Sequence, residues 1–261
     1  MTKKNTVKTK SDRNFDSIAG KFQQNIYNTT KGRLRQLVLQ RDLLELALLS
    51  QPGCRVLDVG GGQGQLALWL AGLGHQVTLT DLSGEMLALA QQAATAQQLK
   101  VQIQQWSLQQ LAEQQQSAPL VLCHAVLEWL AEPAEAIRQL YQLVEPGGVL
   151  SLMFYNVDAK RFSNIVYGNF NYVLRDLAYK KKVSLSPQNP LDPRDVSDWC
   201  QQAGFIQLSK TGVRCFHDYL RDRTEQETEF DKLLEVELRY NRTEPYASLG
   251  RYQHLLLQKP L

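Results

Sequence analysis

The sequence predicts an α/β fold in which helices cover both faces of a mostly parallel sheet. The first observation is an alternation of short apolar stretches with amphipathic ones, which implies crossover connections between parallel strands. The second is the nearly uninterrupted apolar stretch Leu-Val-Leu-Cys-His at 120–124, typical of a strand covered on both faces. A chain of 261 residues can bury the core of one such domain.

Local signals place the elements along the chain. Ser83 offers a side-chain oxygen at the start of one helix, and Pro133 suits the first turn of another. Thr224 followed three residues later by Glu227 is a capping-box pattern for a late helix. The expected helices are 15–27, about 33–49, 65–73, 83–98, 133–144, 193–203 and 225–239, and the expected strands are 55–59, 75–81, 101–105, 120–124, 148–155, 205–209 and 252–257.

The chain is expected to form one domain over residues 12–261, preceded by a disordered basic tail at 1–11. Within the domain, residues 12–50 form an N-terminal helical cap before the first strand. Residues 157–190 interrupt the rhythm with aromatic, basic and irregular sequence after the fifth strand, and are interpreted as an inserted lid.

Composition excludes several classes of protein. No apolar run approaches the roughly 20 residues that span a bilayer, and the N-terminus has no apolar segment of a secretory signal. The 4 cysteines are not arranged as C-x-x-C pairs, so neither a metal site nor a disulfide framework is expected. We therefore expect a cytoplasmic protein without a metal or a membrane partner. The net charge of +3 permits an anionic partner without requiring one.

A glycine-rich segment, Asp58-Val-Gly-Gly-Gly-Gln-Gly64, joins the first strand to its helix. Glycines there allow a tight turn and a close approach of the backbone to a ligand. Alone the segment is weak evidence, because Gly62-x-Gly64-x-x-Ala67 also satisfies the dinucleotide fingerprint of nicotinamide and flavin enzymes. Asp81, at the end of the second strand, can accept both hydroxyls of a ribose in either kind of site.

Two further features favour S-adenosylmethionine over a nicotinamide. Asp58 precedes the glycines, where a carboxylate can face a cationic amino group, and Pro146-Gly147-Gly148 leads into the fifth strand. Together with Asp81, this pattern resembles that of the class I S-adenosylmethionine-dependent methyltransferases, which have a Rossmann-like fold. The resemblance implies that Gly60, Gly61 and Gly62 cradle the methionine part near Asp58, that Asp81 and Leu82 hold the ribose, and that Ser107 and Leu108 hold the adenine. Many relatives carry an acid at the adenine position, and this chain does not.

More specific segments are similar to the bacterial tRNA 5-carboxymethoxyuridine methyltransferases, from about Asp12 to the end of the chain. They include Asp12–Asp16, Asn25–Tyr27, Thr29–Arg35, His124–Trp129, Leu152–Asn156, Lys210–Leu220 and Glu244–Tyr252. This resemblance implies that Arg35 and His124 also contact the cofactor. It further implies that the methyl group passes to the carboxylate of a modified wobble uridine at position 34, in the anticodon loop of tRNA.

Such a transfer needs no catalytic base, because a carboxylate is already ionised at neutral pH. The enzyme must instead orient the acceptor and bind its charge, for which arginine is suited. The candidates for contact with the substrate are Tyr27, Lys31, Tyr155 and Arg214. His124 ends the fourth strand, where ligands bind in such sheets, although a core histidine fits the same position.

Aromatic residues interleaved with cations at 157–190 suit single-stranded RNA, and equally suit a lid packed by its own rings. Two alternatives to the tRNA enzyme stay open. One is a methyltransferase for a small carboxylic acid or a quinone precursor. The other is a methyltransferase-like protein that binds RNA or acts as a scaffold without catalysis.

Overall fold

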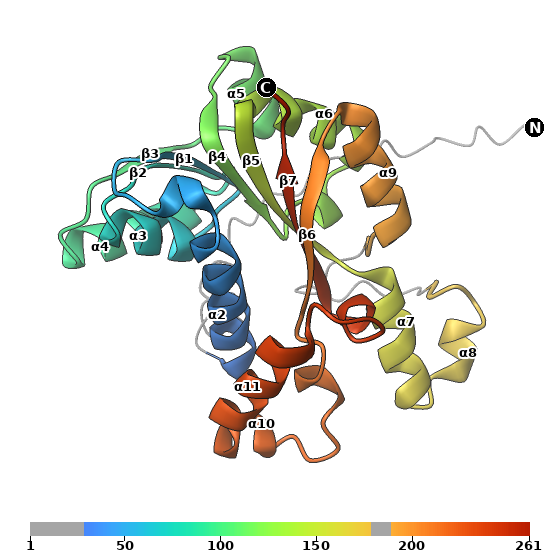
Figure 1. The fold of residues 1–261 in the computed structure, drawn as a ribbon. Coiled ribbons are helices and arrows are strands. Elements are labelled where there is room, and N and C mark those ends of the chain that lie inside the picture. The colour runs from blue at the N-terminus through green and yellow to red at the C-terminus, as the bar shows by residue number, and fades with distance from the viewer. Residues whose placement is uncertain (1–28, 179–188) are drawn as a thin grey trace, which may run out of the picture.

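The computed structural model describes residues 29–178 and 189–261 (Figure 1). Several predictions lie outside the described residues, namely the tail at 1–11, the helix at 15–27 and the substrate candidate Tyr27. The same is true of Lys180 to Lys182, which are cations of the predicted lid. The division of the domain into a cap and a lid stays a prediction.

A single seven-stranded sheet forms the centre of the described structure, with strand order β3-β2-β1-β4-β5-β7-β6. The first five strands are parallel, and β7 is antiparallel to both of its neighbours, β5 and β6. The sheet is therefore mostly parallel, as the sequence predicts. The strands are β1 (Arg55–Val59), β2 (Gln76–Thr80), β3 (Val101–Gln104), β4 (Ala118–His124), β5 (Val144–Tyr155), β6 (Ile206–Val213) and β7 (Tyr252–Gln258).

Helices cover both faces of this sheet and extend beyond one of its edges. In Figure 1, α7, α8, α10 and α11 gather below the strands, where α2 also reaches. The helices are α2 (Thr30–Leu44), α3 (Gln65–Gly72), α4 (Gly84–Ala96), α5 (Leu108–Glu113), α6 (Pro133–Leu143), α7 (Val157–Val166), α8 (Phe170–Val173), α9 (Pro193–Ala203), α10 (Glu225–Thr228) and α11 (Phe230–Tyr240), with 3-10 turns η2 (Ala47–Leu49), η3 (Leu127–Trp129), η4 (His217–Tyr219) and η5 (Ala247–Leu249).

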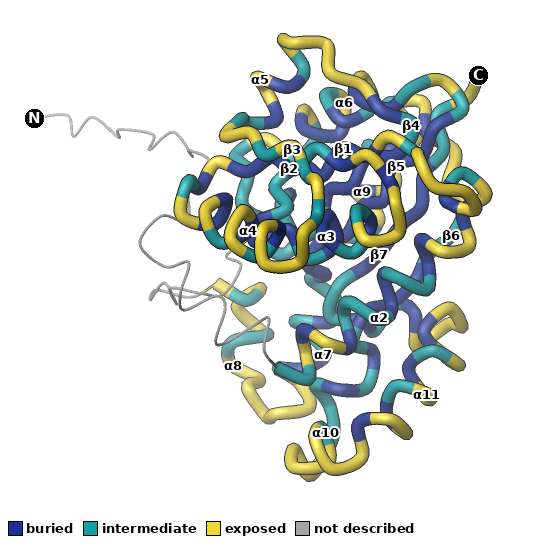
Figure 2. Tube along the Cα trace, turned by 90° about the vertical axis from the view of Figure 1, so that its left-hand side faces the viewer, coloured by how far each residue is buried: buried dark blue, intermediate teal, exposed yellow. Residues whose placement is uncertain are grey.

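The core consists of two apolar layers, one on each face of the sheet, because side chains alternate along a strand. Leu120 and Leu122 of β4 belong to the layer under α2, α3, α4 and α11, whereas Val121 belongs to the layer under α5, α6 and α9. Figure 2 shows the strands as a buried centre, with exposed residues concentrated on the surrounding helices and turns. The sheet is thus held as a rigid platform for the loops at its edges.

Several local predictions are confirmed and others are wrong. The Ser83 hydroxyl accepts a hydrogen bond from Met86 N at 3.2 Å, as predicted for a helix cap. The capping box at Thr224 is wrong, because its hydroxyl donates to Asp222 at 2.7 Å and makes no cap bond, and the predicted 225–239 helix breaks at Glu229.

The segment after β5 is more regular than predicted. Residues 157–166 form the helix α7, which the Asn156 side chain caps by accepting from Asp158 N at 2.9 Å. The short helices α5 and α8 were also not predicted, since four to six residues give too little periodicity to detect. Among the described helices, none combines the length and the apolar character needed to cross a bilayer.

We expect the layer under α6 to be sensitive to cavity formation. Leu140 of α6 is fully buried, so Leu140→Ala should lower the free energy of unfolding by about 2–5 kcal/mol. Leu174, which is 81% exposed, provides the matched control, and Leu174→Ala should change it by less than about 0.5 kcal/mol. Urea denaturation of the two variants measures both values, and an equal effect would contradict this assignment of the core.

Candidate active site

The loop between β1 and α3 needs glycine at its first two positions. Gly60 has a φ of +66°, and a Cβ on it would lie 2.6 Å from Cγ2 of Val126. A Cβ on Gly61 would lie 2.5 Å from Oδ2 of Asp58. The loop therefore accepts only glycine at these positions, because neighbouring side chains pack directly against its backbone.

Asp81 fixes this loop from the end of β2. Its Oδ2 accepts from Gly62 N at 2.9 Å, and its Oδ1 accepts from Ser83 N at 2.8 Å. The carboxylate is thereby held between the first two strand–helix loops, and it is 9% exposed. A carboxylate oxygen can accept two hydrogen bonds, so this group is chemically suited to a pair of ribose hydroxyls.

Asp58 lies at the end of β1 beneath the loop and is 3% exposed. Burial and the negative charge of Asp81 together raise the pKa of Asp58 to about 7, with burial the larger cause. A cation bound beside Asp58 would relieve both effects. We therefore expect a cationic group to bind beside Asp58, which is the position where the sequence predicts the amino group of the ligand.

The residues predicted to hold an adenine begin the helix α5 after β3. The Ser107 hydroxyl accepts from Gln110 N at 3.1 Å, and Ser107 N donates to the Gln110 side chain at 2.8 Å, which is a reciprocal capping box. Leu108 is buried, whereas Leu82, across from them, is 37% exposed. Gln105 links the two loops by donating to Leu82 O at 3.0 Å.

His124 ends β4, and the chain then turns sharply at Ala125, which has a φ of +58°. Burial lowers the pKa of His124 well below its ordinary value, and the charge of the nearby Arg35 lowers it further. The imidazole is therefore neutral. Glu128, four residues on, is fully buried, and burial raises its pKa to about 7 although the charge of Arg35 opposes this. Arg35, on α2, thus lies close to both side chains.

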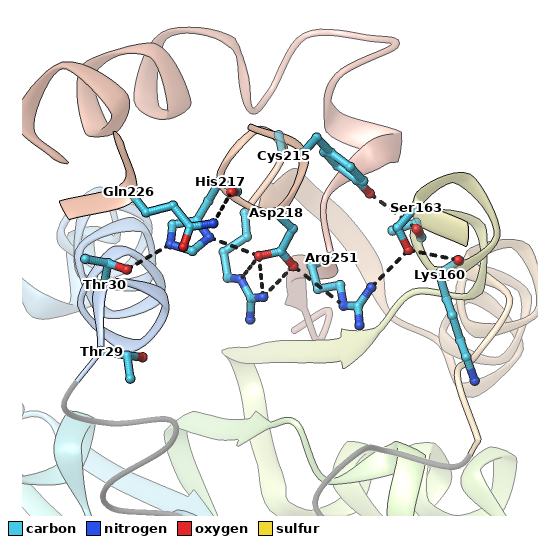
Figure 3. Close-up of polar contacts among 12 residues, drawn as sticks. Thr29, Thr30, Lys160, Ser163, Cys215, His217, Asp218, Gln226 and Arg251 are labelled. Carbon is cyan, nitrogen blue, oxygen red and sulfur yellow. Dashed lines mark hydrogen bonds and ion pairs between the residues drawn. The ribbon is translucent and has the colours of Figure 1, made fainter. Parts of the chain in front are cut away.

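A second polar cluster surrounds Asp218 beyond the ends of β5 and β6 (Figure 3). Its carboxylate accepts from Arg214 at 2.6 Å and from the His217 ring at 3.0 Å, and it lies 3.7 Å from Nε of Arg251. Burial would raise the pKa of Asp218, but the charge of Arg214 and the bonds from His217 and Arg214 outweigh it, so the pKa is lowered. The other ring nitrogen of His217, Nε2, forms a hydrogen bond of 3.0 Å with the hydroxyl of Thr30, at the start of α2.

Arg251 links this cluster to β5. Its Nη1 donates to Ser163 on α7 at 3.3 Å, and its guanidinium lies 4.9 Å from the centre of the Tyr155 ring. Among the residues that the structure describes, Nη2 of Arg251 has no hydrogen-bond partner. A small cavity of about 190 Å³ adjoins the cluster, and it is lined by Lys31, Ser163, Tyr167, Arg214, Asp218, Arg223, Gln226 and Arg251.

The structure brings together most of the residues that the sequence singles out. Lys31 and Arg214 line one cavity. Tyr155 does not line it, but its ring contacts Arg251, which does. The glycine loop, Asp58 and Asp81 form a second group at the ends of β1 and β2.

Sequence reasoning missed Arg251, Asp218 and Arg223. Arg251 precedes the last strand, and the amino end of a strand lies at the binding edge only when that strand is antiparallel. The sequence carries no signal for the direction of β7.

In the described ranges, 29–178 and 189–261, no three His, Cys, Asp or Glu side chains are grouped so as to hold a metal ion. S-adenosylmethionine fits the glycine-loop site, because the glycine backbone, the carboxylate of Asp81 and the buried carboxyl of Asp58 match its amino-acid part, ribose and ammonium. The fold and this site together define a class I S-adenosylmethionine-dependent methyltransferase.

Comparison with known proteins agrees and goes further. A family model described as a methyltransferase domain matches residues 57–152. The chain is 49% identical over 253 residues to the tRNA 5-carboxymethoxyuridine methyltransferase of Escherichia coli K12, covering 95% of this chain and 97% of that one. It therefore belongs to the family of tRNA 5-carboxymethoxyuridine methyltransferases.

More distant relatives share part of the chain or the fold alone. A ubiquinone biosynthesis O-methyltransferase of Xanthomonas campestris pv. campestris (strain B100) is 34% identical over 158 residues, covering 60% of this chain and 64% of that one. The crystal structure of a magnesium protoporphyrin IX methyltransferase from Synechocystis PCC 6803 with bound SAH has a TM-score of 0.65 at 18% identity, covering 94% of this chain and 96% of that one.

Gly61→Ala should weaken the binding of S-adenosylhomocysteine at least tenfold, because the new methyl group would collide with the Asp58 carboxylate. Gly72→Ala is the matched control, since a Cβ on Gly72 meets nothing within 4 Å, and binding should be unchanged. Titration calorimetry compares the two. Equal affinities would show that the packing of Gly61 against Asp58 does not serve the binding site.

The affinity for S-adenosylhomocysteine should also depend on pH through Asp58. Below about 7 this carboxyl is protonated in the free protein and cannot balance an ammonium. Affinity should therefore fall by up to about tenfold per pH unit as the pH is lowered from 7 to 5.5. Asp58→Asn should bind weakly with a flatter profile. Glu128 titrates in the same range, so Glu128→Gln is measured in parallel, and it should keep the dependence.

Proposed function

We propose that this protein transfers the methyl group of S-adenosylmethionine to the carboxylate of 5-carboxymethoxyuridine in tRNA, forming the methyl ester. The curated relative named for this activity is similar along nearly the whole chain, which supports the proposal. We further propose that the substrate is the wobble nucleotide at position 34 and that the protein binds the anticodon loop in the cytoplasm.

For the cofactor, we propose that Gly60, Gly61 and Gly62 hold the methionine part, with Asp58 facing its ammonium group. Asp81 and Leu82 would hold the ribose, Ser107 and Leu108 the adenine, and Arg35 and His124 would complete the pocket. The bound cofactor supplies an activated methyl group on a sulfonium. The role of the protein is then to hold the acceptor in line with that group, a proximity effect of roughly 7–11 kcal/mol.

The observation that carries the proposed acceptor is the cationic cavity beside Tyr155. Four cationic side chains line it against a single carboxylate. Arg214 is committed to Asp218 through hydrogen bonds, whereas Arg251 keeps Nη2 for a ligand and is 28% exposed. We therefore add Arg251 to the substrate candidates Lys31, Tyr155 and Arg214, and we propose that Arg251 holds the acceptor carboxylate. An ionised acceptor needs charge neutralisation and orientation, which an arginine provides.

The same cavity and the helices beside it suit the rest of an RNA loop. Lys31 and Arg223 are placed to meet phosphates, and Arg223 also lies 5.4 Å from the centre of the Tyr167 ring. Tyr167 and Phe170 are 46% and 60% exposed, so both rings are available for stacking on bases.

The proposal is tested with tRNA that carries unesterified 5-carboxymethoxyuridine. Incubation with the protein and S-adenosylmethionine, followed by nucleoside mass analysis, should show the gain of one methyl group. Arg251→Ala should slow this at least 100-fold, since an arginine–carboxylate contact and its orientation are lost together. Arg138→Ala, which breaks an exposed ion pair with Glu135 on α6, should leave the rate unchanged.

A second candidate follows from the similarity to the ubiquinone biosynthesis O-methyltransferases. It predicts methylation of a small free acid or quinone precursor without RNA. Transfer to such a compound, together with no mass change in the tRNA, would replace the proposed function by this one.

A further inference from the structure

A chain of hydrogen bonds runs from His124 into the interior of the protein. Nε2 of His124 lies 2.9 Å from Oγ of Ser151 on β5, and this oxygen lies 2.7 Å from Nε2 of His254 on β7. Nδ1 of His254 lies 2.7 Å from Oδ2 of Asp42 on α2. Ser151, His254 and Asp42 are all fully buried, whereas His124, at the end of its strand, is partly exposed.

Strand register explains why these side chains meet. His124 is paired with Met153 across β4 and β5, and Met153 is paired with His254 across β5 and β7. Paired residues share one face of a sheet, and so does Ser151, two residues before Met153. All three polar side chains therefore project toward α2, on which Asp42 lies.

The buried end of the chain fixes the direction of every hydrogen bond. Asp42 also accepts from Arg41 and from Arg242, each at 2.8 Å, and Arg242 pairs with Glu45 as well. Burial would raise the pKa of Asp42, but the hydrogen bond from His254 and the charges of Arg41 and Arg242 lower it, so Asp42 is ionised and accepts only. The His254 Nδ1–H therefore donates to Asp42.

The charge of His254 then follows from its neighbours. Arg41 and Arg242 are balanced by Asp42 and Glu45, so a protonated His254 would place an uncompensated charge at a fully buried position. With His254 neutral, its Nε2 accepts from the Ser151 hydroxyl, and the Ser151 oxygen accepts from His124 Nε2–H. His124 is left with a lone pair on Nδ1.

We propose that Ser151, His254 and Asp42 are positioning residues that hold His124 neutral, in its Nε2–H form, so that Nδ1 accepts a hydrogen bond from the ammonium group of S-adenosylmethionine. The inference rests on the proposed contact between His124 and the cofactor. Of the hydrogen-bond donors on that molecule, the ribose hydroxyls are assigned to Asp81 and the adenine amino group to the end of β3. The ammonium has three N–H donors, so it can face Asp58 and still donate to His124, whereas an acceptor carboxylate has no proton to donate to Nδ1.

The form of His124 is observable by nitrogen NMR of the full chain, labelled at its 4 histidines and saturated with S-adenosylhomocysteine, which carries the same ammonium. His124→Gln identifies the His124 signals. We expect a neutral ring protonated at Nε2. A ring protonated at Nδ1, or at both nitrogens, would overturn the proposal even if no relay variant folds.

Binding measurements separate positioning from a general structural role. Ser151→Ala should weaken the binding of S-adenosylhomocysteine about tenfold, as expected for one charge-assisted hydrogen bond. It should leave unchanged the binding of methylthioadenosine, which keeps the ribose and adenine but lacks the ammonium. Ser209→Ala on β6 is the matched control, because its buried hydroxyl has no partner among the described residues, and it should affect neither ligand.

Two results would contradict the positioning role. Equal weakening of both ligands by Ser151→Ala would show that Ser151 only maintains the fold, and no weakening of either would show that the relay does not act on the site. Failure of the unaltered protein to bind S-adenosylhomocysteine would instead contradict the proposed function itself, and the relay with it.

Discussion

The antiparallel pairing of β7 with β5 is the constraint on which both halves of the site depend. It sets Tyr252 beside Tyr155, so the residue before β7, Arg251, arrives at the edge where the parallel strands end. The same register sets His254 beside Met153, two residues after Ser151, so that His254 and Ser151 meet in the relay that reaches His124. A parallel last strand would have carried both residues to the opposite edge of the sheet. One strand direction therefore supplies an arginine for the proposed acceptor and a buried histidine for the proposed cofactor contact.

The two ligand halves of the site differ in their electrostatics. Around the glycine loop, Asp58 and Asp81 are buried together, and burial with the negative charge of Asp81 raises the pKa of Asp58 to about 7. Around Tyr155, cations outnumber carboxylates. A cofactor with an ammonium group completes the first half, and an anionic acceptor completes the second. Each ligand therefore meets a surface of opposite charge, and the two are not interchangeable.

Sequence reasoning predicted the elements whose physical causes are local. Alternating apolar segments identify β1 to β5 and the helices between them, and the glycines with Asp58 and Asp81 follow from motifs of adjacent residues. It failed where the cause lies elsewhere in the chain. The irregular segment after β5 proved to contain α7, whose cap residue Asn156 also donates to Ser248 O and Gly250 O, more than 90 residues away.

The acceptor side was only partly predictable for the same reason. Arg214 was identified as a substrate candidate, but its bidentate partner Asp218 was not, and neither was the pairing that places Arg251. His124 was identified by its place at the end of a strand. The relay behind it joins α2, β4, β5 and β7, which only the folded register brings together.

The carboxylates of Asp218 and Asp42 share one design. Asp218 is held by Arg214, Arg251 and His217, and Asp42 by Arg41, Arg242 and His254. In each case burial alone would favour the protonated acid, and the surrounding cations and hydrogen bonds keep it ionised. Both acids therefore act as fixed acceptors, and each one orients a side chain that we propose to contact a ligand. A carboxylate acceptor needs no catalytic base, so no polar residue of this protein has to remove a proton from it. We therefore propose that these two networks contribute by fixing the orientation of the side chains that contact the ligands.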